Sequence, residues 1–438
     1  MNTLSNWQDN FQCKLLPMIE AVDLIQSEDV IWAGGLLSSP IHFLLELEKR
    51  TSKLKECVLY TGLLTHPFKF LQPEYKTSLK HKSLFMGPLE RKLQKSGNIE
   101  MLNFHFSQFA ELFDHIKPNV TVIEMTPPNE HGYMSMGACG GIANNEAIRH
   151  SKTVIAVINK HQPFLYGKDN LIHVDDITAA TEGHHPIAAP RSEEKISDLE
   201  QKIASNVLPY VNNGMTIQIG IGTISNAIGF ALKDHKDLGI HTEMFTESMM
   251  DLCKSGAVNN SKKNHLPNKI VTSFTAGSQE LIDFVNNNKE IEIGNVIDVV
   301  NAQEIGKNDN FISINTCVMV DVTGQVASEG VGHHQISGSG GQLDFVRGAG
   351  LSKDGISIIA LSSTFKGKNG IESTIKVALP SGTPITTPRN DTQVIVTEYG
   401  SADLRGLSVP ERVEALSAIA HPDFRQAIKD ESLAVGLC

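Results

Sequence analysis

The chain of 438 residues has few of the features that assign a protein to a class at first sight. Its six cysteines are scattered without a C-x-x-C pair, so they offer no zinc framework and fit reduced thiols in a cytoplasm. No apolar run reaches the length of a membrane span, and the polar N-terminal residues lack the hydrophobic stretch of a signal peptide. We therefore expect a cytoplasmic protein that has no metal site and does not enter a membrane.

The chain is also short of positive charge and of familiar catalytic motifs. It has 38 Lys and Arg against 49 Asp and Glu, and its formal net charge of −11 argues against general nucleic-acid binding. A local basic pocket can still hold an anionic ligand. A G-x-S-x-G elbow, an H-E-x-x-H helix and a P-loop lysine are absent. Glycine, by contrast, is plentiful with 35 residues, so glycine turns are the places to search for a binding site.

Residues 216–251 combine a glycine turn, a helix and an acidic residue in one unit. The stretch begins with a short run of β-branched apolar residues that two glycines interrupt, which predicts a strand and a turn. Ser225 and Asn226 offer N-cap oxygens to a helix that we expect to reach about Asp237. A second strand is predicted at 240–245. The order is therefore strand, turn, helix, strand.

Two functional interpretations of this unit compete, because a glycine turn at a helix N-terminus aims backbone N–H groups at an anion. Dinucleotide binding requires G-x-G-x-x-G and an acidic residue roughly 20 positions later, and Gly220-Ile-Gly222-Thr-Ile-Ser225 lacks the third glycine. In the second interpretation Glu243 is a nucleophile at a strand end, beside backbone amides of the turn. An ordinary crossover with a surface carboxylate is the structural alternative.

An earlier stretch repeats this pattern, with a strand at 30–32 that runs into Gly34, a serine and a helix. Aligning Gly34 with Gly220 brings the two stretches into register. Two further pairs of apolar strands follow in the same order: 120–125 with 318–322, and 152–160 with 356–363. The shared order predicts an ancestral duplication of an α/β domain.

Each half alternates β-branched strands with helical stretches, which is typical of open, mainly parallel sheets with helices on both faces. The segment 182–195 is rich in proline and charge and predicts a linker. We therefore expect an N-terminal α/β domain over 1–186 and a C-terminal α/β domain over 187–438. Ligands in such folds bind at the carboxyl ends of strands, so clefts are expected at 220–225 and 337–344.

Several other stretches carry functional side chains whose roles the residues alone leave open. The loop 337–344 has three glycines within five residues and either lets a ligand approach the backbone or forms a tight turn. A Pro-Pro bend precedes Glu130, His131 and Tyr133, where a structural turn is the alternative to a site. His333 and His334 are assigned to a loop surface or a pocket wall. Glu398, Asp403 and Arg405 either bind a ligand or form an ion pair within the protein.

Taken together, these stretches resemble the acetyl-CoA hydrolase/transferase family of CoA-transferases, and within it the 4-hydroxybutyrate and butyrate:acetate CoA-transferases. The resemblance spans nearly the whole chain. The stretches that carry it are PPNEHGYMSMG (127–137), QIGIGT (218–223), LGIHTEMF (238–245), SGSGGQLDFVRGA (337–349) and VTEYGSADLRG (396–406). Their combination is far more specific than any one glycine motif.

The resemblance implies two similar open α/β domains and a catalytic glutamate that forms a covalent glutamyl-CoA thioester, which HTEM places at Glu243. It also implies that Gln218 lines the pocket, and that a second CoA-contacting loop contains Gly338 and Gly341. Lys366 is also implied to contact CoA. The residues implied to contact CoA and to supply oxyanion amides are Gly220, Ile221, Gly222, Thr223 and Ile224.

The activity implied is transfer of CoA between acetyl-CoA and a carboxylate such as 4-hydroxybutyrate or butyrate. Coenzyme A is then a substrate, and no permanently bound cofactor is expected. The partners are acyl-CoA and short-chain carboxylates, without nucleic acid or membrane, and homo-oligomerisation is left open. The alternatives are an acetyl-CoA hydrolase, an NAD-dependent oxidoreductase that uses the same glycine turn, and a non-catalytic acyl-CoA-binding protein.

Overall fold

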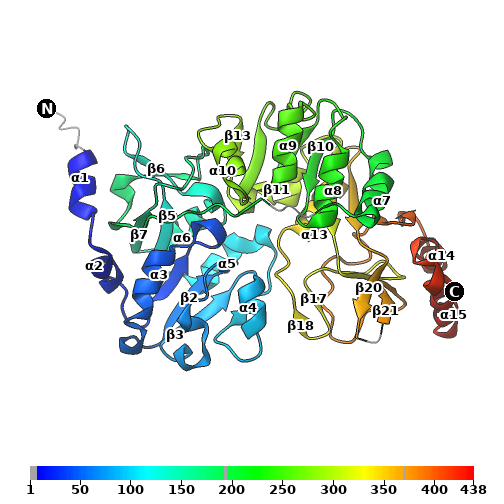
Figure 1. The fold of residues 1–438 in the computed structure, drawn as a ribbon, viewed down its shortest axis with the longest axis horizontal. Coiled ribbons are helices and arrows are strands. Elements are labelled where there is room, and N and C mark those ends of the chain that lie inside the picture. Colours follow the sequence, from blue (N-terminus) through cyan, green and yellow to red (C-terminus); the bar gives the residue numbers. More distant parts are fainter. Residues whose placement is uncertain (1–6, 192–194, 369) are drawn as a thin grey trace. The chain divides into compact units, whose positions relative to one another are not determined.

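The computed structural model describes residues 7–191, 195–368 and 370–438. The chain forms two compact units (Figure 1). The first comprises residues up to 191 together with 271–299, and the second comprises the remainder. The segment 271–299 thus belongs with the first unit, although the predicted division at residues 186 and 187 placed it in the C-terminal half. No helix in the described part of the chain is long and apolar enough to cross a membrane.

The first unit is built on a seven-stranded parallel sheet with the order β4-β3-β2-β1-β5-β7-β9. Its interior strand β5 is buried along its whole length, as expected for a parallel strand covered on both faces. The strands are β1 (Val30–Ala33), β2 (Cys57–Thr61), β3 (Leu79–Ser83), β4 (Glu100–Met101), β5 (Val120–Met125), β7 (Thr153–Ile158) and β9 (Ala179–Glu182).

Successive side chains of β5 point to opposite faces of this sheet, and each face has its own core. Val120 and Val122 pack with helices α2 and α3, whereas Ile123 and Met125 pack with α1. The other helices, the antiparallel pair of β6 and β8, and the strands β12 and β13 complete the unit. The bounds are α1 (Trp7–Lys14), α2 (Met18–Asp23), α3 (Ile41–Glu48), α4 (Pro88–Leu93), α5 (Phe109–Ile116), α6 (Asn144–His150), α10 (Gln279–Val285), α11 (Val296–Val299), β6 (Tyr133–Ser135), β8 (Leu171–His173), β12 (Ile270–Thr275) and β13 (Ile291–Ile293).

Within the second unit, a mainly parallel sheet has the strand order β11-β10-β14-β19-β23-β24, and only β24 is antiparallel to its neighbour. Helices α7, α8 and α9 lie side by side along it (Figure 1). The elements are β10 (Thr216–Ile219), β11 (Gly239–Phe245), β14 (Phe311–Thr316), β19 (Ile356–Ala360), β23 (Val394–Thr397), β24 (Gly400–Asp403), α7 (Asp198–Val207), α8 (Thr223–Ala231), α9 (Glu247–Ser255), α12 (Ala302–Ile305), α13 (Gln342–Leu351), α14 (Val409–Ile419) and α15 (Pro422–Ala434).

Smaller sheets accompany the main sheet of the second unit. Strands β15 (Met319–Asp321), β16 (Val326–Ala327) and β22 (Ile375–Lys376) form one of them. Two ribbons of paired strands are β17 (Gly330–Val331) with β18 (His334–Gln335), and β20 (Thr364–Gly367) with β21 (Gly370–Ser373).

The strand neighbours confirm the predicted fold class of two similar α/β units. Strand β1 lies between β2 and β5, and β10 lies in the same way between β11 and β14. The alignment of Gly34 with Gly220 therefore matches equivalent strand ends, and β7 and β19 are equivalent too. The pairing of 120–125 with 318–322 is wrong, because 318–322 contributes to the separate sheet of β15, and β14 is the counterpart of β5. An apolar run does not reveal which sheet it joins.

Candidate active site

The glycine turn leads directly from β10 into helix α8. Gly222 is the residue before the helix, and its φ of 103° and ψ of 175° belong to a region that residues other than glycine rarely adopt. The predicted N-cap at Ser225 or Asn226 is wrong, because this conformation lets the helix begin earlier, at Thr223. The Oγ atom of Ser225 donates instead to the carbonyl of Ile221. The helix also ends at Ala231, before the expected Asp237.

The turn and Glu243 lie at the same edge of the sheet, because β10 and β11 are parallel neighbours. Thr216 pairs with Gly239 and Ile217 with Ile240, and continuing this register by four residues places Gly220 level with Glu243. The residues 221–223 are exposed. Backbone amides of the turn are therefore accessible to a ligand at the level of the carboxyl group.

Glu243 is partly buried near the end of β11 and is held by the second glycine loop. Its Oε2 atom accepts the backbone N–H of Gly341 at 2.8 Å. Burial raises the pKa of Glu243 to about 7, although the N–H of Gly341 opposes the shift and the charge of Asp344 adds to it. A desolvated carboxylate is a stronger nucleophile than one in water.

Gly341 occupies a position with no room for a side chain. A Cβ atom at this residue would lie 2.4 Å from Oε2 of Glu243 and 2.4 Å from Cγ1 of Val300. Helix α13 begins at the next residue, Gln342. The glycine thus allows the backbone at the start of α13 to approach the carboxyl group closely, which favours the interpretation of this loop as part of a site. The nearby Gly338 is buried in the same loop.

Gln218 lies on β10, and its amide group is fixed by two polar residues of the neighbouring strand β14. Oε1 of Gln218 accepts from Oγ of Ser313 at 2.9 Å and from Nδ2 of Asn315 at 3.1 Å, and its Nε2 donates to Oδ1 of Asn315 at 3.1 Å. Our sequence reasoning missed Ser313 and Asn315. Polar residues at alternate positions of an otherwise apolar strand, FISINT, were the available signal.

Lys366 is exposed on β20, and no described contact joins it to Glu243 or to either glycine loop. Nη2 of Arg405 lies 2.6 Å from Oδ2 of Asp403, so these two side chains pair with each other at the surface, which was the alternative to ligand binding. Glu398 accepts hydrogen bonds from both the N–H and the hydroxyl of Ser363. Glu130 and His131 are exposed in the turn before β6. Among the described residues, no three His, Cys, Asp or Glu side chains group as metal ligands would.

A parallel and a mainly parallel sheet, with a partly buried glutamate and glycine turns at the carboxyl edge of the second, define an α/β protein with a candidate active site at a strand edge. Models of the acetyl-CoA hydrolase/transferase N-terminal domain and C-terminal domain match residues 1–189 and 277–432. The chain therefore belongs to the acetyl-CoA hydrolase/transferase family, which confirms the predicted resemblance and the class of enzyme.

Among the similar proteins is the 4-hydroxybutyrate coenzyme A transferase of Clostridium kluyveri, which is 38% identical over 97% of this chain and 98% of the relative. The butyryl-CoA:acetate CoA-transferase of Anaerostipes caccae is 35% identical over 98% of each chain. The crystal structure of RipA from Yersinia pestis superposes with a TM-score of 0.91, at 30% identity, covering 99% of this chain and all of that one.

Proposed function

We propose that this protein is a CoA-transferase that exchanges CoA between acetyl-CoA and a short-chain carboxylate such as butyrate or 4-hydroxybutyrate, through a glutamyl-CoA thioester on Glu243. The observation that carries the proposal is the contact between Glu243 and the N–H of Gly341, in a setting that desolvates the carboxyl group. CoA is the substrate, and no permanently bound cofactor takes part. We keep the cytoplasm as the proposed compartment.

The reaction begins when a carboxylate oxygen of Glu243 attacks the thioester carbonyl of acetyl-CoA. The C–S bond breaks, giving an acetyl-glutamyl anhydride and CoA thiolate. The thiolate then attacks the glutamyl carbonyl, the bond from that carbonyl to the bridging oxygen breaks, and acetate leaves with glutamyl-CoA remaining. An incoming carboxylate reverses these steps and departs as the new acyl-CoA. One thioester replaces another, so the exchange needs no ATP.

Each attack creates a tetrahedral oxyanion that needs hydrogen-bond donors already in place. The backbone amides of Ile221 and Gly222 suit this role because both residues are exposed and directly follow Gly220, which is level with Glu243. The N–H of Gly220 itself donates to the carbonyl of Ile314 at 2.8 Å, so Gly220 is proposed as a CoA contact only. Thr223 and Ile224 continue the turn toward CoA, and Gln218 is the proposed pocket wall. Gly338, Gly341 and Lys366 are proposed as CoA contacts from other parts of the second unit. Binding energy from the distant part of CoA can be used to drive these steps.

A hydrolase is the second candidate, because water that attacks the same thioester would release CoA without exchange. The family description includes both activities. The dinucleotide alternative has less support, since the turn lacks the third glycine and the family is defined by acyl-CoA chemistry. Whether the site shields the glutamyl-CoA thioester from water therefore decides between a transferase and a hydrolase.

We expect acetyl-CoA to exchange with acids of two to four carbons faster than it is hydrolysed. An apolar pocket separates substrates that differ by one methylene group by only about 1–3 kcal/mol, so acceptance should be broad. The test compares free-thiol release from acetyl-CoA alone with new acyl-CoA formation after adding acetate, propionate, butyrate, 4-hydroxybutyrate or succinate. Thiol release as fast as exchange would identify a hydrolase, and a strong preference for succinate would imply a cation that binds a second carboxylate.

Substitution of Gly222 by alanine is expected to lower the exchange rate about 100-fold while the protein stays folded at the assay temperature. A Cβ at this position meets no atom within 4 Å, so the cost comes from backbone strain, about 1–3 kcal/mol. Relief of that strain would turn the amides away from the oxyanion. Gly256→Ala is the matched control, because Gly256 also has a positive φ, 78°, and open space at the end of α9. Activity that falls only in step with thermal unfolding would make the turn a fold element alone.

A further inference from the structure

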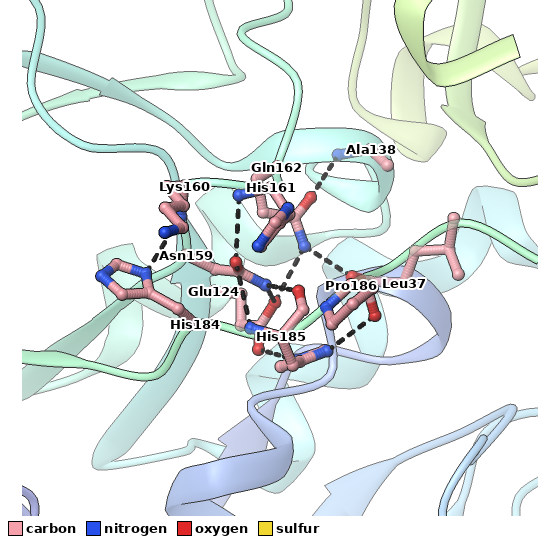
Figure 2. Close-up of polar contacts among 10 residues, drawn as sticks. All are labelled: Leu37, Glu124, Ala138, Asn159, Lys160, His161, Gln162, His184, His185 and Pro186. Atoms are coloured by element: carbon pink, nitrogen blue, oxygen red, sulfur yellow. Dashed lines mark hydrogen bonds and ion pairs between the residues drawn. The ribbon is translucent and has the colours of Figure 1, made fainter. Parts of the chain in front are cut away.

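Glu124 is a fully buried carboxylate of the first unit that the proposed reaction does not use (Figure 2). It lies on β5, on the sheet face that packs with α2 and α3. Its Oε1 atom is 2.5 Å from Nε2 of His185, and its Oε2 atom accepts Nδ2 of Asn159 at 3.0 Å and Nε2 of Gln162 at 2.9 Å. A buried charge is costly without such partners, so this arrangement requires an explanation.

The amide of Gln162 connects Glu124 to two turns. Its Oε1 atom accepts the backbone N–H of Ala138 at 3.1 Å, and its Nε2 atom also donates to the carbonyl of Leu37 at 2.6 Å. These backbone partners fix which end of the amide faces Glu124, and that end is the donor. Leu37 lies in the turn after β1, and Ala138 lies in the turn that follows the 127–137 motif.

The amide of Asn159 connects Glu124 to the segment after β9. Its Oδ1 atom accepts the N–H of His161 at 3.0 Å, and its Nδ2 atom donates to the carbonyl of His185 at 2.9 Å (Figure 2). Asn159 therefore also presents a donor to Glu124. The segment that contains His185 leads to residue 191, where the N-terminal part of the first unit ends.

Both ring nitrogens of His185 face oxygen atoms that can only accept. Nε2 meets the carboxylate of Glu124 at 2.5 Å, and Nδ1 meets the carbonyl of Pro186 at 3.0 Å. A neutral imidazole has one donor, whereas the imidazolium has two, so beside an ionised Glu124 this geometry fits the charged ring. The hydrogen bond to Glu124 raises the pKa of His185, and burial opposes the shift.

Among the described residues, the ring of His42 faces the pair, and His184 is the neighbour of His185 in sequence. The ring of His42, on α3, is 5.4 Å from that of His185, and burial lowers the pKa of His42, as does the charge of His185. His184 accepts the N–H of Lys160 at 3.2 Å and lies 4.0 Å from Glu182. His42 therefore favours its neutral form beside a charged His185, and His184 provides an adjacent histidine for comparison.

We propose that Glu124 and His185 are a positioning pair for the enzyme's reaction, in which their ion pair fixes the turn after β1 while His185 carries a proton. That turn is the counterpart, in the duplicated fold, of the turn at Gly220. Ser38 strengthens the connection, since its hydroxyl accepts from Cys139 N–H at 3.1 Å and donates to the carbonyl of Met136 at 3.2 Å. The inference rests on the proposed function in one respect, which is that the turn after β1 contributes to CoA exchange.

The sign of the pH dependence follows from the raised pKa of His185. Its contribution to folding is fully present below the ordinary value of about 6.5 and is lost as the pH rises through the higher folded value. Deprotonation leaves a ring nitrogen without a proton facing an oxygen atom, so the charge of Glu124, which also holds the Gln162 amide that contacts the turn after β1, is less well compensated. Replacing either member of the pair by glutamine removes this titration.

Stability is measured first, in the Glu243→Gln background, so that the second carboxyl group does not contribute. Thermal midpoints between pH 5.5 and 9 should fall by about 2 °C or more with rising pH in that background and in its His184→Gln control. The fall should vanish with His185→Gln or Glu124→Gln. An equal fall in all four proteins, or none in any, would overturn the ion pair. If His185→Gln does not fold, Glu124→Gln carries the test.

Exchange kinetics in the otherwise wild-type chain test the positioning role. Wild type and His184→Gln should lose kcat/KM at alkaline pH, with the same midpoint as the stability curve. His185→Gln should be about 10-fold slower at pH 7 and should lack that alkaline loss. A kcat/KM profile that His185→Gln leaves unchanged, although the stability titration is gone, would show that the pair is structural alone and overturn the proposal. Because the stability arm does not depend on exchange, failure of the ion pair is distinguishable from failure of the proposed function.

Discussion

Glu243→Ala is expected to lower CoA exchange by about 10⁴-fold or more while leaving CoA binding largely intact. The substitution removes the carboxyl group whose oxygen would form the anhydride and whose carbonyl carbon would form the thioester, whereas the glycine turn and the remaining CoA contacts persist. The measurement pairs steady-state exchange of acetyl-CoA with butyrate and calorimetric titration with CoA. Turnover at the wild-type rate would contradict the assignment of Glu243 as the nucleophile.

The free energy of unfolding is measured as a control for the Glu243 variants. It shows whether a loss of exchange is caused by unfolding. The folded pKa of Glu243, about 7, is above its ordinary value of 4.5, so its ionisation costs stability as the pH rises between these values. Glu243→Gln should therefore match the wild type below pH 4.5 and exceed it by up to about 3 kcal/mol above pH 7. An inactive variant that is at least as stable as the wild type excludes unfolding as the cause.

Gly341→Ala is expected to lower exchange by about 10²- to 10³-fold. The backbone at Gly341 has a φ of −100°, which alanine adopts freely, so the effect comes from space alone. The added methyl group would lie 2.4 Å from Oε2 of Glu243 and would displace the carboxyl group or the N–H that it accepts. A displacement of this size removes the alignment that the attack on the thioester requires.

Gly350→Ala, in the same helix α13, is the matched control. Its Cβ would make only an ordinary contact, 3.5 Å from Nε2 of Gln393, and alanine in a helix is more stable than glycine by about 1 kcal/mol. This variant should keep wild-type exchange. Wild-type exchange in Gly341→Ala would instead mean that the carboxyl group does not act from the position seen in the structure.

Much of the second unit could be predicted from local pattern. The β-branched run, the glycine turn and the strand that carries Glu243 are confirmed, because their signals lie within a few residues of each other. The start of α8 was wrong, since the sequence does not show that Gly222 adopts a positive φ. The contact between Glu243 and Gly341 spans 98 residues and is a product of the sheet. The family resemblance predicted that both residues belong to one site. The periodicity of the sequence could not predict this, because it reports only on neighbouring residues.

In the first unit, the contact between Glu124 and His185 could not be predicted from sequence patterns. His185 stands in a segment rich in proline and charge, which reads as a linker, yet the structure buries most of its ring against Glu124. A single acidic residue within the apolar strand VTVIEM was the available signal, because a buried carboxylate needs donors. The partners come from 35 to 61 residues away in sequence, so only the fold identifies them.

Covalent trapping tests the central claim most directly. The wild-type enzyme is incubated with acetyl-CoA, reduced with borohydride, digested and analysed by peptide mass spectrometry. Reduction of a glutamyl-CoA thioester converts the side-chain carboxyl to a primary alcohol, which replaces one oxygen atom by two hydrogen atoms. We expect this change at Glu243, only when acetyl-CoA is present, and not in Glu243→Ala. A modification at another residue, or exchange at full rate without any modified peptide, would contradict a glutamyl-CoA intermediate on Glu243.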